Sequence, residues 1–197
     1  MRVLHINSYY QTGPFYKNLF DRQAALGDEI RVYMPAPKGY EAKGRDFGPY
    51  TQVDLNHYRL DRLSFHLKQY KMLRGALRLY APGGCDVIHA HSLLTNGGVA
   101  LSLHKKWGVP YVVAVRDTDV NVLMRRMPFL RPLAREILEN AARVIFLSAS
   151  YRDRALLPYL SKEQRTRVLE KSRVVPNGID ALWLTNPPPP RTAPSPG

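Results

Sequence analysis

PYVVAV, Pro110 to Val115, is a short run dominated by β-branched residues, and the fold prediction starts from it. Similar runs occur at DVIHAH (Asp86 to His91), ARVIFLS (Ala142 to Ser148) and SRVVP (Ser172 to Pro176). Near-continuous apolar runs of this length are typical of strands that are buried on both faces. We therefore predict a mainly parallel sheet that is covered by helices.

Helical patterns separate these strands, and the amino-terminal part of the chain repeats the alternation. Further strands are predicted at Arg2 to Ile6, Glu29 to Pro35 and Thr51 to Leu55. Helices are predicted at Phe15 to Ala25, Gly98 to Trp107, Pro128 to Asn140 and Tyr151 to Leu160. Pro35 and Pro37 are expected to end the second strand. This order predicts a single α/β domain with a Rossmann-like, doubly wound sheet, whose ligands bind at the carboxyl ends of the strands.

A long amphipathic helix is predicted from Tyr58 to Tyr80. Its apolar residues recur at steps of three and four, at Leu60, Leu63, Leu67, Tyr70, Leu73, Leu77 and Tyr80. Its polar positions carry an excess of cations, among them Arg62, Lys68, Lys71, Arg74 and Arg78. One interpretation is that the leucines face the sheet and the cations are solvated. The other is that the helix rests on an anionic membrane.

The chain ends in TNPPPPRTAPSPG, Thr185 to Gly197, which contains four consecutive prolines. Proline lacks a backbone donor and fixes φ, so this segment favours extended polyproline over a packed element. We expect a domain over residues 1–184 and a proline-rich linker or disordered tail over residues 185–197.

Composition limits the classes of function. The 197 residues, 45% of them hydrophobic, fit one domain with a sizeable core. The single cysteine, Cys85, and the absence of a signal-like start predict a cytoplasmic setting. No apolar stretch approaches the length of a membrane span.

A net charge of +13 suits anionic partners such as sugar nucleotides or anionic lipid, whereas no nucleic-acid-binding motif is present.

Four loops that follow predicted strands hold the candidate binding residues. Gly13 and Pro14 open the first helix, where free N–H groups can contact a phosphate, although plain turn chemistry also explains them. Arg116, Asp117 and Asp119 follow PYVVAV, and Ser148 ends ARVIFLS. Carboxylates accept hydrogen bonds from sugar hydroxyls and arginine binds phosphate, so the loop at Arg116 suits a sugar nucleotide; a solvated ion-pair loop is the alternative.

Two histidines lie in the strand DVIHAH. His89 and His91 share one face of that strand, and His91 stands where the loop begins, which makes it the better candidate for a site. His89 is expected to be structural. No cysteine or third histidine is nearby, so we expect no metal site.

Taken together, DVIHAHSLLTNGGVA, GVPYVVAVRDTDVN, ARVIFLSAS and RVVPNGID (Arg173 to Asp180) resemble the amino-terminal half of GT-B glycosyltransferases of family GT4, the group 1 glycosyltransferases. The resemblance covers nearly the whole chain, from Arg2 to Asp180. Its specificity lies in the ordered spacing of these segments. The chain departs from the family pattern at two places. In the first loop, the usual glycine pair is reduced to Thr12-Gly13-Pro14. After the Val-rich strand, Arg116-Asp117 stands at a position that is often histidine.

The resemblance implies a retaining, metal-independent transfer of sugar from a UDP- or GDP-sugar, without a cofactor, to a glycan, lipid-linked or cell-envelope acceptor. His91 would lie near the transferred sugar, and Asp117 and Asp119 would line the acceptor side. A second, carboxy-terminal GT-B domain, which is absent here, holds most donor contacts in that family. We therefore expect this chain alone to be inactive.

Two other functions stay open on the sequence. One is a non-catalytic basic module that docks on anionic membrane or polymer, for which the expected location is the inner face of the membrane. The other is half of a GT-B-like sugar-nucleotide epimerase, against which the segment Pro176 to Asp180 argues.

Overall fold

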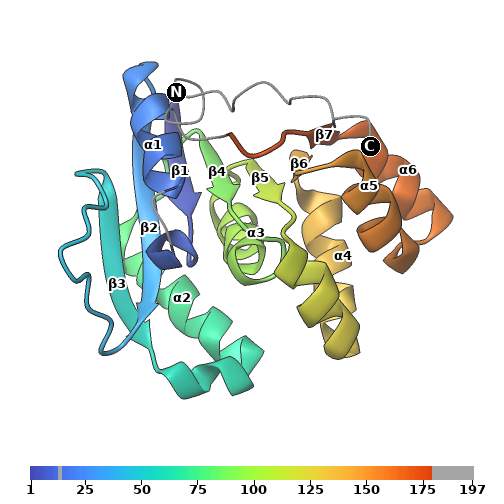
Figure 1. The fold of residues 1–197 in the computed structure, drawn as a ribbon, viewed down its shortest axis with the longest axis horizontal. Coiled ribbons are helices and arrows are strands. Elements are labelled where there is room, and N and C mark those ends of the chain that lie inside the picture. Colours follow the sequence, from blue (N-terminus) through green and yellow to red (C-terminus); the bar gives the residue numbers. More distant parts are fainter. Residues whose placement is uncertain (13–14, 179–197) are drawn as a thin grey trace, which may run out of the picture.

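Seven parallel strands form one sheet in the computed structural model, which describes residues 1–12 and 15–178 (Figure 1). Their order is β3-β2-β1-β4-β5-β6-β7, and every neighbouring pair is parallel. The strands are β1 (Arg2–Ile6), β2 (Glu29–Pro37), β3 (Thr51–His57), β4 (Val87–Ala90), β5 (Tyr111–Ala114), β6 (Arg143–Phe146) and β7 (Ser172–Val174). The order reverses direction between β1 and β4, which confirms the predicted doubly wound, Rossmann-like α/β fold.

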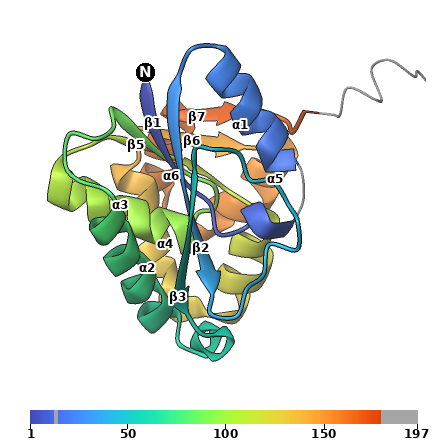
Figure 2. The same cartoon turned by 90° about the vertical axis from the view of Figure 1, so that its left-hand side faces the viewer.

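Helices cover both faces of the sheet. Figures 1 and 2 show α1 (Phe15–Ala25) on one face and α2 (Phe65–Leu79), α3 (Thr95–Trp107) and α4 (Arg131–Asn140) on the other. Helix α2 packs on α3, α3 packs on α4, and α4 packs on α6 (Lys162–Glu170). The separation follows from the topology, because right-handed crossovers that run in opposite directions along the sheet put their helices on opposite faces.

Short helical segments fill several connections. They are the 3₁₀ helices η1 (Tyr10–Thr12), η2 (Arg59–Leu63), η4 (Pro128–Leu130) and η6 (Leu157–Tyr159), the π-helical η3 (Thr118–Met124) and η5 (Arg152–Leu156), and α5 (Ala149–Tyr151). The helix predicted over residues 151–160 is thus divided into pieces, and α6 was not predicted. Strand β2 runs through Pro35 to Pro37, so Pro35 does not end it as expected.

The core follows from the apolar runs of the strands. On the side of α2, α3 and α4, Ile88, Tyr111 and Val144 belong to a large buried cluster that continues into α3 and α4. On the side of α1, Val3, Val32 and Phe20 form a smaller one. The sheet is buried on both faces where β1 and β2 lie under α1. The prediction of burial on both faces for the later apolar runs is wrong, because buried residues alternate with more exposed ones in β4 and β6, and two of the three residues of β7 are exposed.

The prediction of one helix from Tyr58 to Tyr80 is wrong. Ser64 separates η2 from α2 with an extended backbone. The buried face of α2 is formed by Met72, Gly75 and Ala76, while Leu60, Leu67 and Tyr70 of the expected stripe are exposed. The small residues Gly75 and Ala76 let α2 pack closely on the sheet. As a result, part of the predicted leucine stripe faces solvent.

No helix within the described part of the chain combines the length and hydropathy that a bilayer crossing requires. The tail over residues 185–197, Gly13 and Pro14, and the last two residues of RVVPNGID lie outside the described residues. The predicted boundary at residue 184 lies there as well.

Candidate functional site

A pocket of about 690 Å³ lies beside α1, on the face of the sheet that carries this helix. Phe15, Leu19 and Arg22 form one wall, and the ends of β4, β5, β6 and the segment after β7 form the floor and the opposite wall. The pocket thus lies where the strand order reverses, which is the usual ligand position in open α/β sheets. Its lining is mostly apolar with a few polar side chains, a composition that is typical of small-molecule sites.

Arg116 connects three strand ends at this pocket. Its Nε donates to the carbonyl of His91 at 3.3 Å, and its Nη1 donates to Oδ1 of Asn177 at 3.3 Å. The guanidinium lies over the ring of Tyr16 on α1, 5.8 Å from its centroid. These contacts hold a cation at the pocket wall while part of its side chain stays exposed. Arg116 is thereby placed to meet an anionic or hydroxyl-rich ligand.

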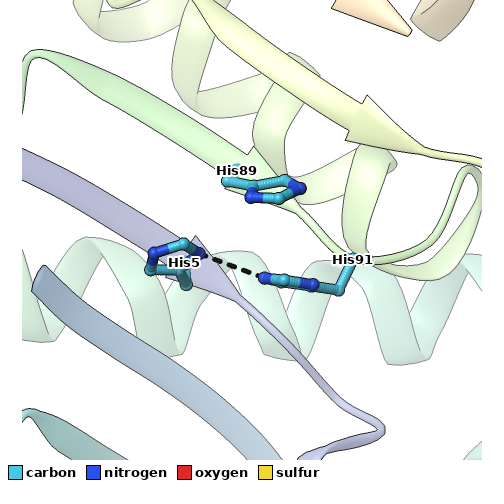
Figure 3. Close-up of side chains that lie close together, drawn as sticks. All are labelled: His5, His89 and His91. Carbon is cyan, nitrogen blue, oxygen red and sulfur yellow. Dashed lines mark hydrogen bonds between the residues drawn. The ribbon is translucent and has the colours of Figure 1, made fainter. Parts of the chain in front are cut away.

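Three histidines lie close together (Figure 3), and two of them, His89 and His91, line the pocket. The parallel register pairs His5 of β1 with His89 of β4, and His91 follows two residues later. His5 Nδ1 lies 3.0 Å from His91 Nε2, and the rings of His89 and His91 stack with centroids 4.2 Å apart. The expectation that no third histidine is nearby is wrong, because strand pairing brings His5 across from a distant part of the sequence.

These histidines are neutral at physiological pH. Burial lowers the pKa of His5 and of His91 well below its usual value, and lowers the pKa of His89 to about 4. The charge of Arg116 adds to the effect at His89 and His91. His91 and His89 both line the pocket, and His91 is 1% exposed. A neutral imidazole can donate or accept a hydrogen bond, so the floor of the pocket is polar without being charged.

Asp119 is fully buried and does not line the pocket. Its Oδ2 accepts from the N–H groups of Leu93 at 2.7 Å and Arg116 at 3.0 Å, and its Oδ1 accepts from Leu94 N–H at 2.9 Å. Burial raises the pKa of Asp119 to about 6, while these N–H groups and Arg116 oppose the increase. The carboxylate therefore holds the loop before α3 against the loop that carries Arg116.

The other predicted site residues lie around the pocket or outside it. Asp117 is exposed and accepts from the side-chain amide of Asn121. Ser148 is exposed and caps α5 by accepting from Tyr151 N–H at 3.1 Å. Neither residue lines the pocket. Gly13 and Pro14 lie outside the described residues, so their contact with phosphate stays a prediction.

The predicted cations of the α2 region are in different environments. Lys71 bonds to Asp61 at 2.6 Å and Arg78 bonds to Asp54 at 2.6 Å, whereas Lys68 is half-buried, which lowers its pKa. Arg74 is exposed and its guanidinium lies over Tyr70. The side chain of Arg62 lies outside the described residues. Membrane contact through these residues stays a prediction.

Sequence reasoning missed His5, Asn177 and the wall that α1 contributes. The signal for Asn177 was present, since Asn177 lies in the conspicuous RVVPNGID segment directly after a strand. The signal for His5 was weaker, because only the correct register of β1 against β4 shows that His5 faces His89.

Comparison with known proteins gives two similarities. Residues 12–178 match the family model described as glycosyl transferase 4-like domain. Among solved structures, one described as sucrose-phosphate synthase from Thermosynechococcus elongatus matches with a TM-score of 0.63 and 18% sequence identity, over 94% of this chain and 94% of that chain. At this identity the structural likeness concerns the fold. No curated protein sequence is significantly similar.

Proposed function

Since the chain belongs to the glycosyl transferase 4-like domain family, we propose that it is the acceptor-binding half of a retaining, metal-independent glycosyltransferase. GT4 enzymes use nucleotide-sugar donors; we propose a UDP- or GDP-sugar here, and a glycan, lipid-linked or cell-envelope acceptor. The observation that carries the proposal is the pocket at the strand ends, in which Arg116 bridges the ends of β4, β5 and the segment after β7.

The lining of the pocket fits a sugar substrate. Phe15 and Leu19 offer apolar surface to the C–H groups of a sugar ring, and Arg116 and Asn177 offer donors and an acceptor to its hydroxyls. His91 lies at the floor as a neutral imidazole, where it can hydrogen-bond to the transferred sugar. Asp119 takes a positioning role, because its oxygens are occupied by backbone N–H groups.

A carboxy-terminal GT-B domain completes the active site in this proposal. During transfer, the bond from the anomeric carbon to the donor diphosphate breaks and a bond to an acceptor hydroxyl oxygen forms, while the hydroxyl proton passes to an oxygen of the departing diphosphate. Charge develops on the departing diphosphate, and its stabilisation supplies much of the rate in such sites. This chain contributes Arg116 to one side of the cleft, and the remaining donor contacts belong to the second domain. The chain alone is therefore proposed to be inactive.

Arg116→Ala is expected to lower kcat/KM for sugar transfer by roughly 10- to 100-fold in a protein in which this chain is joined to its carboxy-terminal domain. The substitution removes the cation from the pocket wall but leaves the buried core intact. Arg143→Ala is the control, because Arg143 is exposed at the opposite, amino-terminal end of β6. Equal rates for the two variants would contradict the role of the pocket.

Membrane docking is a second candidate function, favoured by the exposed apolar residues of the η2–α2 region. Leu60 is 74% exposed and Tyr70 is 57% exposed, and the guanidinium of Arg74 lies over the ring of Tyr70. An apolar and basic surface of this kind can rest on the anionic inner face of a cytoplasmic membrane.

Leu60→Asp is expected to lower binding to phosphatidylglycerol vesicles by about 10- to 100-fold, because burial of one leucine contributes about 1.5–3 kcal/mol. Cosedimentation measures the bound fraction. Leu26→Asp serves as the control, since Leu26 is 86% exposed and follows α1, outside the η2–α2 region. An unchanged bound fraction in Leu60→Asp would rule out docking through this surface.

A further inference from the structure

The three neighbouring histidines, of which His89 and His91 line the pocket, form a compact set of nitrogen donors. His5, His89 and His91 each offer a ring nitrogen, and these atoms all lie within 4.8 Å of one another. Figure 3 shows the rings gathered where β1 and β4 end. His5 Nδ1 and His91 Nε2 face each other at 3.0 Å, and the ring of His89 lies beside them with a buried Nε2 that has no hydrogen-bond partner among the described residues. A buried nitrogen without a partner is available to a ligand.

The chemistry of these side chains selects one class of ligand. Neutral imidazole nitrogen is the donor that zinc and related first-row transition metals prefer, whereas magnesium and calcium prefer oxygen. We propose that His5, His89 and His91 form a binding site for Zn²⁺ or a similar divalent transition metal.

Metal binding requires only a small rearrangement of the three histidine side chains. Two nitrogens that bind the same tetrahedral metal at about 2.1 Å lie about 3.4 Å apart, and His5 Nδ1 and His91 Nε2 are 3.0 Å apart. The metal would replace the hydrogen bond between them. The ring of His89 now stacks on His91 and has to turn toward the metal, and it borders the open pocket. A water molecule from the pocket would supply the fourth ligand.

Arg116 opposes the metal. Its positive charge already contributes to the lowered pKa of His89 and of His91, and the same repulsion would act on a dication. No carboxylate belongs to the histidine set. The site is therefore weaker than a site with an acidic partner, and Arg116→Gln should bind the metal more tightly than the wild-type chain.

A metal bound at this position would affect sugar transfer, and this effect rests on the proposed function. A metal at the floor would immobilise His91 and occupy space beside the transferred sugar. Transfer by the two-domain protein would then proceed in EDTA and be inhibited by Zn²⁺, with His5→Gln relieving the inhibition. The metal is an inhibitor in this scheme and takes no part in the transfer.

Calorimetric titration of the metal-free 197-residue chain with ZnCl₂ tests the site without any substrate. We expect one Zn²⁺ per chain, and a loss of affinity of about 10- to 100-fold in His5→Gln and in His89→Gln. His66→Gln is the control, because His66 is an exposed histidine on α2, away from the pocket. Circular dichroism confirms that each variant is folded, and visible absorption of bound Co²⁺ gives a second readout of nitrogen coordination.

Absence of binding, or equal affinity in the wild-type chain and in both folded His5→Gln and His89→Gln, would overturn the metal site. Loss of transfer in EDTA would contradict the metal-independent function while leaving the binding result intact. The two failures are thus distinguishable.

Discussion

Gly75→Ala is expected to destabilise the fold by about 3–5 kcal/mol. A β-carbon at this position in α2 would lie 1.9 Å from Asp54 Oδ2 and 2.3 Å from the hydroxyl oxygen of Tyr33. The hydroxyl of Tyr33 lies 2.8 Å from Asp54 Oδ2, and Asn56 Nδ2 donates to both of them at 2.7 Å. Entry of a methyl group would force α2 away from β2 and β3 and break these bonds.

The direction of the change in the free energy of unfolding distinguishes this close packing from an ordinary helix interior. In an ordinary helix interior, alanine stabilises relative to glycine by up to about 1 kcal/mol. Urea unfolding monitored by circular dichroism measures the difference. Arg74→Ala, at the preceding exposed position of the same helix, should change the free energy of unfolding by less than about 0.5 kcal/mol. A Gly75→Ala variant as stable as the wild-type chain would show that α2 does not pack as described.

Asp119→Asn is expected to cost about 2–4 kcal/mol of stability, because an amide cannot replace the carboxylate here. Three backbone N–H groups converge on the two carboxylate oxygens. Asparagine has one acceptor oxygen, and its NH₂ group would face at least one of these donors. The loop before α3 and the loop at Arg116 would lose their common partner, so the free energy of unfolding and the position of Arg116 should both change.

Asp117→Asn is the matched control for this substitution. Asp117 is exposed two positions earlier, and its contact is to the side chain of Asn121. Its replacement should alter the free energy of unfolding in urea by less than about 0.5 kcal/mol. Similar losses in the two variants would indicate that the buried hydrogen bonds of Asp119 carry little of the stability.

Much of the fold could be predicted because it follows from local patterns in the sequence. The strand Arg2–Ile6 and the helix Phe15–Ala25 match the predicted ranges, since strand runs and helix starts depend on neighbouring residues. The exposure of Leu67 and Tyr70 on α2 could not be predicted in the same way. Gly75 allows close approach to Tyr33 and Asp54, and this long-range packing decides which face of the helix is buried.

The site was predicted only in part for the same reason. Arg116 and His91 follow strands, so a rule about strand ends finds them. His5 lies inside a strand, 86 residues before His91, and its contact with His91 exists only once β1 pairs with β4. Asp119 was predicted to face substrate because it is a charged residue in a strand-end loop. Its burial depends on three backbone donors that the sequence does not reveal.

Nucleotide release from a panel of UDP- and GDP-sugars, with and without saccharide acceptors, tests the central claim most directly. The assay compares this chain alone with the same chain joined to its carboxy-terminal domain. Acceptor-dependent release by the two-domain protein in EDTA, and none by the chain alone, is the predicted result. Turnover by the isolated chain, or no release by the two-domain protein with any donor, would contradict the assignment of this chain as the acceptor-binding half of a glycosyltransferase.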